Sequence, residues 1–497
     1  MSAQAPTSAD EAALERFGYR QELRRELHRF ASFAVGFSFI SITTGIFTTY
    51  GSVLSWGGPM GVWTWPIVIV GQLLVALVFG ALAARIPLAG YSYQWMSRLG
   101  NPILGWLVGW TTFGFLVVDV VAVDYALAQT VLPALLGYSA TTGAVWLGTA
   151  LVIVVQGLLI ALSTVLTARV NSIAVGTEII GIVGLTLALF LVALLTGHLH
   201  GANLFATGSV ARAGYFGAGG LTKDSPFEFS FLLGAFTIVG FEAAANLAEE
   251  TKDAVNVVPR VMWQSVVLSG IIGFAFLVVL DIVAVHFAAL SASATPVADI
   301  VTSTLGGLVG KLFLLLVTFS IFACGLVIYV TATRLTWAMS RDRRFPGSSV
   351  LSLVNRRFDS PLAAAVVVGI LLEVVLAIFA RQSAALTDLF SAATLLPCLI
   401  YLVTVILYAA VRRRLPGTVG FALGRWEGAV IVLALVWLVF ELTIFRDASF
   451  AVPWEYVGVM LAIGLVYLGW LLVRRPGALA APAEAGDPSA AAGAREA

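Results

Sequence analysis

Seven carboxylates of this chain lie inside long apolar stretches of the sequence. They are Asp119, Asp124, Glu178, Glu242, Asp281, Glu373 and Glu441. An ionisable group within hydrocarbon is costly to keep, so it indicates by default a solute pathway or a proton relay. No Lys or Arg lies comparably deep, and ion pairs therefore cannot neutralise all seven. We expect some of them to be protonated, hydrogen-bonded to backbone or facing water.

These carboxylates do not carry equal weight. Glu242 is the first candidate for proton coupling, with a structural role as an equal alternative. Glu178 is the second, because it lies about two helical turns inside its apolar stretch. Asp119 and Asp124 share one stretch and could recognise a cationic group. The other three are expected near interfaces or in structural pairs.

Two of the apolar stretches are interrupted at their centres. The first contains Ser41–Phe47 and the sixth contains Ile238–Ala243. Inside a bilayer, backbone that leaves the helix has no water to bond, so a break is tolerated only where it lines a protein or water cavity. Matching breaks in two repeats usually flank the substrate site of a transporter. Gly45 and Gly240 could instead be close-packing glycines in continuous helices, but their matching positions favour two breaks.

The interrupted segments indicate which solute would bind. In the first, small hydroxyl side chains precede a half-helix whose free amides and partial positive charge suit a carboxylate. In the sixth, carbonyls freed around residues 238–240 could accept protons from an ammonium group, while Phe236 or Phe241 closes over the site. The two segments together fit a zwitterion.

Membrane-spanning helices must position these residues. Of the 497 residues, 60% are hydrophobic and 11% are charged, and the mean hydropathy is +0.97, values that do not suit a soluble domain. About twelve windows of the roughly 20 apolar residues that cross a bilayer fit between residues 31 and 473. We expect them near 31–54, 62–86, 103–132, 143–165, 171–196, 229–250, 261–288, 311–338, 361–380, 385–411, 428–446 and 453–473. The sequence therefore predicts an all-α polytopic membrane protein.

Positive charge sets the orientation of the chain in the membrane. If residues 1–30 face the cytoplasm, all but five of the 28 Lys and Arg residues lie on that side, in agreement with the positive-inside rule. Residues 1–30 are polar and do not resemble a removable signal peptide. Residues 476–497, rich in Ala, Pro, Gly and Glu, are expected to be disordered. We expect a multi-pass protein of the inner (plasma) membrane with both termini in the cytoplasm.

Other chemistries find little support in the sequence. Cys324 and Cys398 both lie within spans, and no metal-ligand cluster, phosphate-binding loop or nucleophile and base pair stands out. A net charge of +1 indicates no nucleic-acid partner. We therefore expect no enzyme activity, no cofactor and no metal site. The expected partners are a small solute, a coupling ion and membrane lipids, with the energy supplied by a gradient or by exchange.

Four groups of segments resemble those of a known group of transporters. They read Gly36–Ser38 with Thr44–Ile46; Arg85–Trp95 with Gly105-Trp106 and Gly109-Trp110; Gly240–Asn246 with Glu249–Lys252 and Val258–Arg260; and Arg334–Met339 with Arg341-Asp342, Phe345-Pro346 and Ser360–Ala363. In their order and spacing, from about residue 30 to 475, the chain resembles the amino acid, polyamine and organocation permease superfamily. It is most similar to the branch that includes bacterial amino acid permeases and the 4-aminobutyrate and choline permeases.

The resemblance implies a fold and a binding site. The fold would be LeuT-type and work by alternating access, within a transmembrane domain at 31–475: inverted repeats at about 31–196 and 229–411, and peripheral helices at about 428–473. By the same resemblance, the contacts to the substrate carboxylate would be Thr43, Thr44, Gly45 and Ile46. The contacts to the amine would be Phe236, Val239 and Gly240, with Phe241 as a possible cover. Glu242 matches a carboxylate that relatives place just after the second break, where protonation can couple the two ends of the site.

Further positions bear on coupling and gating. Some sodium-independent relatives carry a lysine in the middle of the fifth span, where alignment places Gly184 in this chain. The coupling ion is therefore open between a proton, which we prefer, and sodium, and Glu178 could supply a proton site or part of a cation site. Glu249 and Glu250 lie at the cytoplasmic mouth. We expect them to pair with arginines of the segment 334–357 as an inward gate.

The sequence thus predicts a secondary active permease that imports an amino acid or a related amine, with proton symport preferred. An amino acid exchanger and a choline or polyamine permease are the alternatives within this class. A non-transporting nutrient sensor built on the same fold is the alternative outside it, although such sensors usually carry a long ordered cytoplasmic extension.

Overall fold

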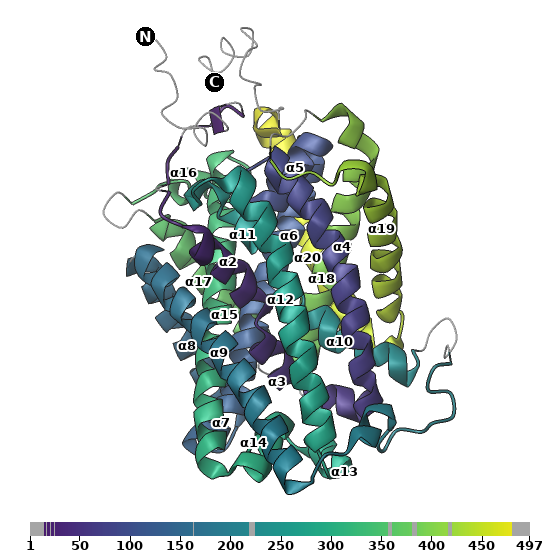
Figure 1. The fold of residues 1–497 in the computed structure, drawn as a ribbon. Coiled ribbons are helices and arrows are strands. Elements are labelled where there is room, and N and C mark those ends of the chain that lie inside the picture. Colours follow the sequence, from purple (N-terminus) through teal and green to yellow (C-terminus); the bar gives the residue numbers. More distant parts are fainter. Residues whose placement is uncertain are drawn as a thin grey trace.

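The structure is a computed structural model, and it describes residues 14–479 apart from 16, 20, 24, 163, 218–223, 356–359, 380–384 and 416–419. In this part of the chain nearly all regular structure is helical and no β-strand is present. The long helices run along one common direction (Figure 1). Of the tail predicted to be disordered, residues 480–497 lie outside the described residues, and Pro476–Leu479 forms a short 3₁₀ turn.

The first half of the chain contains one interrupted rod and a set of long helices. The rod consists of α2 (Arg29–Ile40) and α3 (Ile42–Trp56). It is followed by α4 (Thr64–Arg85), α5 (Tyr91–Leu99), α6 (Pro102–Ala126), α7 (Leu132–Leu136), α8 (Thr142–Leu162) and α9 (Thr164–Thr196). A π-helical turn at Leu127–Val131 joins α6 to α7.

The second half begins with another interrupted rod, α10 (Pro226–Thr237) and α11 (Ala243–Asn246). The helices that follow are α12 (Ala254–Val283), α13 (Phe287–Ala292), α14 (Pro296–Leu305), α15 (Gly307–Arg341), α16 (Ser348–Leu351), α17 (Leu362–Phe379), α18 (Ala385–Val411), α19 (Glu427–Ile444) and α20 (Ala451–Arg474). Short 3₁₀ turns lie at Pro59–Trp63, Gly201–Phe205, Ala248–Glu250, Arg412–Arg414, Gly424–Trp426 and Ala448–Phe450.

The predicted membrane spans are found close to their expected places. Within the described residues, 11 helices are long and apolar enough to cross a membrane. The expected sixth span is not among them, because α10 and α11 are separate short pieces. The all-α polytopic membrane fold is therefore confirmed.

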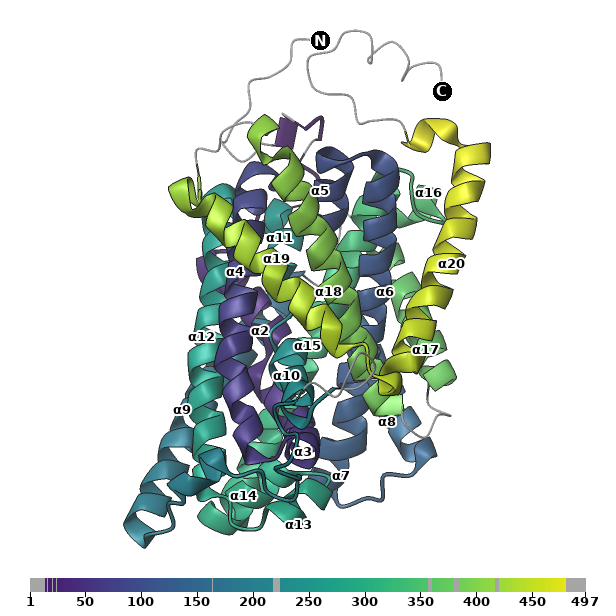
Figure 2. The same ribbon diagram turned by 90° about the vertical axis from the view of Figure 1, so that its right-hand side faces the viewer.

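Burial separates central helices from peripheral ones. In its most apolar window α6 is 89% buried, whereas the corresponding windows of α8, α9 and α20 are 28% buried. Large apolar side chains on the peripheral helices are exposed, as expected of surfaces that face lipid. Figure 2 shows α20 and α9 on opposite sides of the bundle. The two interrupted rods lie between α4, α6, α12, α15 and α18, in the interior of the molecule.

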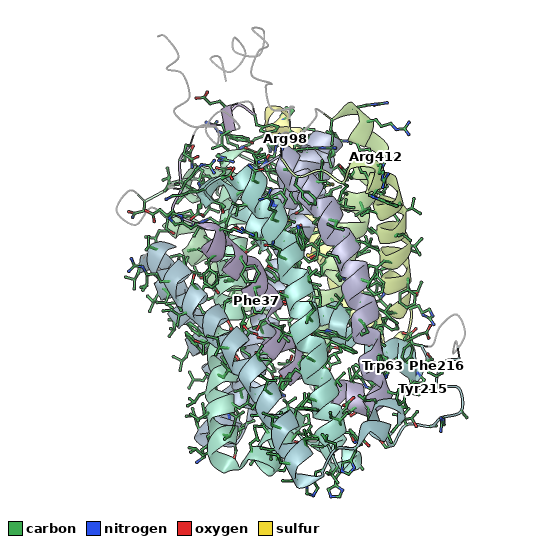
Figure 3. The ribbon with its side chains drawn as sticks, in the orientation of Figure 1. Phe37, Trp63, Arg98, Tyr215, Phe216 and Arg412 are labelled. Carbon is green, nitrogen blue, oxygen red and sulfur yellow. The ribbon has the colours of Figure 1, made fainter. Side chains whose placement is uncertain are left out.

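The two ends of the bundle differ in their side chains. We call the end that carries α5, α11 and residues 14–28 the basic end, and the opposite end, with α13 and α14, the far end (Figure 1). Arg98 and Arg412 lie at the basic end, and Trp63 and Tyr215 lie toward the far end (Figure 3). At the far end the Trp63 indole donates to the Leu204 carbonyl at 2.9 Å, which fixes the segment after α9 against the bundle.

Candidate substrate site and gates

The first rod breaks at a single residue, Ser41. Ser41 has φ 34° and ψ 89°, a left-handed conformation that ends α2 and starts α3 in a new direction. Its hydroxyl accepts from the Thr44 amide at 3.3 Å, as an N-cap side chain does. The break is narrower than the predicted Ser41–Phe47, because the capped helix α3 already begins at Ile42. All four residues predicted to contact a substrate carboxylate lie in the first turns of α3.

The amide end of α3 faces a carboxylate from α9. Glu178 Oε1 accepts from the Thr43 amide at 2.9 Å and from the Ser41 hydroxyl at 3.1 Å. Its side chain is 1% exposed. Gly184, the position aligned with the lysine of some relatives, points elsewhere, since a Cβ added there would meet no atom within 4 Å. The α9 side chain that reaches the break is therefore Glu178.

The second rod breaks over several residues. α10 ends at Thr237, and Gly240 has φ 76°, a value that favours glycine. The Gly240 amide donates to the Tyr401 hydroxyl at 3.1 Å, and that hydroxyl donates to Glu242 Oε2 at 2.7 Å. Tyr401 on α18 therefore connects the broken backbone to the leading carboxylate candidate.

The two breaks lie in direct contact. A Cβ added at Gly45 would lie 2.1 Å from Thr237 Oγ1, and one added at Gly240 would lie 1.8 Å from the Phe39 ring. Cys324 on α15 donates its thiol to the Phe39 carbonyl at 3.4 Å. Each rod thus needs a glycine where the other rod passes, and the junction of α2, α3, α10 and α11 lies in the buried interior.

The remaining carboxylate candidates divide into two groups. Asp119 on α6 is buried and has Glu242 and Cys324 as electrostatic neighbours, which places it at the junction. Asp124 is directed toward α8, where it accepts from Gln156 Nε2 at 2.8 Å. Asp119, Glu178 and Glu242 are therefore the acidic groups around the junction, whereas Asp124 has a partner that explains it structurally.

A cavity of about 60 Å³ lies on the far-end side of the junction. It is bordered by α3, α10 and α18, and its hydroxyl-bearing lining residues are Thr48, Thr49, Ser52, Thr387, Ser391 and Thr394. Phe236 and Phe390 also line it, with ring centroids 4.3 Å apart. Phe241 instead packs on Phe79 and Tyr401. Of the two aromatic residues predicted to close over the site, Phe236 therefore borders this cavity.

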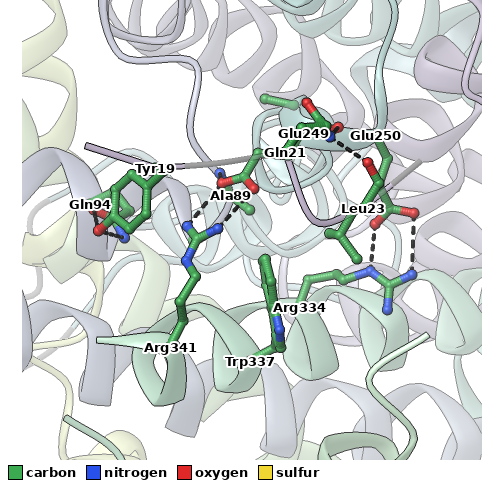
Figure 4. A network of polar contacts seen from close by, with 12 residues as sticks. Tyr19, Gln21, Leu23, Ala89, Gln94, Glu249, Glu250, Arg334, Trp337 and Arg341 are labelled. Atoms are coloured by element: carbon green, nitrogen blue, oxygen red, sulfur yellow. Dashed lines mark hydrogen bonds and ion pairs between the residues drawn. The ribbon is translucent and has the colours of Figure 1, made fainter. Parts of the chain in front are cut away.

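Two buried ion pairs lie at the basic end (Figure 4). Glu249 accepts from both terminal nitrogens of Arg341, at 2.9 and 3.0 Å, and from the Ala89 amide at 3.0 Å. Glu250 accepts from Arg334, with Nη2 at 3.2 Å from Oε2. The Glu249 and Glu250 side chains are 0% and 3% exposed. The predicted pairing of these glutamates with arginines near the end of the eighth span is confirmed.

A polar strap covers these ion pairs. We call residues 14–28, where described, the N-terminal strap. Tyr19 donates to Asp342 at 2.9 Å, and its ring lies 4.1 Å from the Arg341 guanidinium carbon (Figure 4). Arg25 donates to the carbonyls of Ala248 and Thr251 at 2.9 and 2.7 Å. The strap thus ties the segment after α11 to α15.

Sequence reasoning missed two parts of this arrangement. Tyr401 lies in an apolar helix, and no pattern in the sequence distinguishes it from a packing residue. The N-terminal strap is a polar segment of the kind that usually extends into solvent. A signal for it exists in Leu23, an apolar residue among charges, which is buried against Ala89, Trp337 and Ala338.

Comparison with known proteins identifies the family. The family described as amino acid permease matches residues 27–469. The chain belongs to the amino acid permease family. That match includes both interrupted rods and all the long helices except the last residues of α20.

Several named permeases are similar to this family member over most of its length. The amino-acid permease BAT1 of Arabidopsis thaliana is 26% identical over 453 residues, which cover 86% of each chain. The GABA-specific permease of Saccharomyces cerevisiae is 26% identical over 371 residues, 71% of this chain and 64% of the yeast protein. The amino-acid permease 2 of Neurospora crassa is 25% identical over 459 residues, 88% of this chain and 82% of its own.

Proposed function

We propose that this permease is a secondary transporter that imports an amino acid or a related amine by alternating access, coupled to protons. The observation that carries the proposal is the buried junction of two interrupted rods, which brings a helix N-terminus, freed backbone groups and three carboxylates together. Broken helices at the centre of a membrane protein provide binding groups that continuous helices lack. Membership of the amino acid permease family supports an amino acid as the solute.

The proposed pose places the substrate across the junction. Its carboxylate would face the first turn of α3, at Thr43, Thr44, Gly45 and Ile46, where amides and the helix dipole favour an anion. Its amine would face the break after α10, at Phe236, Val239 and Gly240, on the side of Glu242. Phe241 packs against α4 and α18 and would support this wall rather than cover the solute.

The closed basic end and the cavity on the far-end side support alternating access. Glu249, Glu250 and the N-terminal strap would form the gate at the basic end, and Phe236 with Phe390 would separate the far-end cavity from the junction. The positive-inside rule assigns the basic end to the cytoplasm. The structure would then represent a state closed to the cytoplasm, and import requires the two ion pairs to separate.

Proton coupling is proposed to act through the carboxylates of the junction. Glu242, Glu178 and Asp119 are buried there. A buried carboxylate is costly in its charged form, so it would take up a proton readily and release it when the basic end hydrates. Glu242 is linked to the second rod by Tyr401, and Glu178 is linked to the first rod directly.

A second candidate substrate is a cationic amine such as choline or a polyamine. It is favoured by one observation: within the described residues, no lysine or arginine is a partner of the acidic groups around the junction. A net negative site would attract a cation. The carboxylate-accepting end of α3 favours the amino acid instead.

Uptake into proteoliposomes tests the proposal. A mixed panel of radiolabelled amino acids is offered with and without an inside-alkaline pH gradient, and empty liposomes are the control. We expect gradient-stimulated accumulation of at least one amino acid. Uptake that ignores the gradient and requires internal amino acid would make the protein an exchanger, and uptake of choline or polyamines alone would refute the proposed substrate.

A further inference from the structure

One carboxylate of the protein already lies where the substrate carboxylate is proposed to bind. The groups that α3 offers to an anion are the amides of its first turn and the hydroxyls beside them. The Thr43 amide and the Ser41 hydroxyl both donate to Glu178 Oε1, at 2.9 and 3.1 Å. The helix end that would attract a substrate anion therefore already holds a carboxyl group of the protein.

Few donors remain for a second carboxylate in this state. The Thr44 amide donates to the Ser41 hydroxyl at 3.3 Å, and the Gly45 amide donates to the Ser41 carbonyl at 3.0 Å. The Thr43 hydroxyl is buried and lacks a hydrogen-bond partner of normal geometry within the described residues. A substrate carboxylate can gain the Thr43 amide only if Glu178 releases it.

The surroundings of Glu178 show which groups could compensate its charge. α9 packs against α2, α8, α12, α14 and α15. The first rod faces Glu178 with Ser41 and Thr43, and α15 faces it with the thiol of Cys324. Asp119 and Asp124 on α6 are electrostatic neighbours of the same thiol. These neighbours are neutral or acidic, and the Glu178 carboxylate accepts from the Ser41 hydroxyl and the Thr43 amide.

We infer that Glu178 is an internal substitute for the substrate carboxylate, whose protonation frees the α3 N-terminus and so makes amino acid and proton bind together. This inference rests on the proposed function and assigns its coupling to one residue. The ionised carboxylate closes the site against anions. A protonated Glu178 is a poorer acceptor, and the Thr43 amide becomes available to the substrate.

The proton balance of this step is simple. One proton from water adds to the Glu178 carboxylate, which becomes a carboxylic acid, and one zwitterionic amino acid enters. The positive end of the α3 dipole faces one carboxylate before the exchange and one after it. The complex gains one net positive charge. On the other side of the membrane, loss of the amino acid would return the α3 end to Glu178, which then gives up its proton.

Proton uptake per bound amino acid is the measurement that tests the inference. Purified protein in weakly buffered solution is mixed with the amino acid that the uptake panel selects, and a pH indicator records protons taken up while calorimetry records binding. The variants are Glu178→Gln and, as a matched control, Glu441→Gln. Glu441 is an equally buried membrane carboxylate, but it accepts from Gln72 on α4, away from the junction.

For the wild type and the Glu441→Gln control we expect one proton per bound amino acid at a pH where Glu178 is ionised, with affinity falling about tenfold per pH unit. In Glu178→Gln we expect no proton uptake and an affinity that does not change with pH. Ethanolamine, an amine without a carboxylate, is the second probe. Its binding to the wild type should not depend on the protonation of Glu178.

The contrary results are distinct. Amino acid binding without proton uptake by the wild type would overturn this inference and leave the proposed function standing. Undiminished proton uptake by Glu178→Gln would do the same, because another group would then carry the proton. If no amino acid binds at any pH, the proposed function itself fails. Absence of proton uptake by the wild type would overturn the inference even if Glu178→Gln does not fold.

Discussion

Substitution of Glu249 by Gln should open the basic end. The Glu249 side chain is fully buried and accepts from both terminal nitrogens of Arg341 and from the Ala89 amide. Glutamine keeps the shape of the side chain but removes its charge. Arg341 is then left in the closed state without its partner, whereas water can solvate it once the end opens.

The size of the effect follows from the burial of the pair. Removing one partner of a buried ion pair costs about 3–5 kcal/mol. Here the cost falls on the closed state alone. Since about 1.4 kcal/mol is a factor of ten in an equilibrium constant, the ratio of open to closed molecules should rise on the order of 100- to 4,000-fold.

Cysteine labelling measures this ratio. Cys324 and Cys398 are buried, so the parent protein should react slowly with a maleimide. Thr167 lines a cavity of about 30 Å³ together with Glu250 and Arg334, an ion pair of the proposed gate. Thr167→Cys should label slowly in the parent, and much faster when Glu249→Gln is added.

The control for this prediction is a matched ion pair with greater exposure. Glu427→Gln removes a pair with Arg85 whose side chains are 23% and 13% exposed, and it should leave Thr167→Cys labelling within about threefold, because such pairs contribute little. If Cys398 stays unlabelled in the Glu249→Gln variant, general unfolding is excluded. Labelling of Thr167→Cys that is no faster with Glu249→Gln than without it would refute the role of this ion pair as a gate.

Two further predictions concern the junction and the far end. Gly45→Ala should abolish uptake, because its Cβ would lie 2.1 Å from Thr237 Oγ1. A second change, Thr237→Gly, should restore part of the uptake, and the control Gly184→Ala, whose Cβ meets no atom within 4 Å, should leave uptake intact. Normal uptake by Gly45→Ala would disprove the close approach. Burial raises the pKa of Asp224 to about 7, although the Arg446 guanidinium lowers it. This pKa is higher in the folded state than in the unfolded state, so proton binding to Asp224 stabilises the folded protein at acidic pH. That contribution to the free energy of unfolding is lost as the pH rises through about 7. Asp224→Asn should therefore reduce the fall in melting temperature between pH 5 and 8, and an unchanged slope would contradict the shift.

The sequence predicted the parts of the fold that depend on local composition. The spans follow from runs of apolar residues, and the second break follows from Gly240 in a span that also contains Glu242. The pairing of Glu249 and Glu250 with arginines was predictable because acidic and basic groups meet at the same end of the bundle. The observed ion pairs with Arg341 and Arg334 confirm it.

Contacts between distant helices could not be predicted. Ser41 alone forms the first break because its side chain caps α3, and the composition of Ser41–Phe47 does not reveal that residue. Alignment indicated Gly184 of α9 as the position of interest, whereas Glu178 is the α9 residue that reaches the break. Which α9 side chain faces the junction depends on the rotation of α9 about its axis. Tyr401 gives no signal in its apolar helix. The roles of these residues in binding and coupling stay predictions.

Substrate protection of a single cysteine tests most directly the claim that solute binds at the junction. Thr394→Cys on α18 borders the cavity shared with Phe236, and a membrane-impermeant maleimide is added to reconstituted protein. We expect a saturating amino acid mixture to slow labelling at this position and to leave unchanged the rate at Phe216→Cys, an exposed position in the segment between α9 and α10. Equal labelling of Thr394→Cys with and without amino acids, under conditions in which uptake occurs, would contradict it.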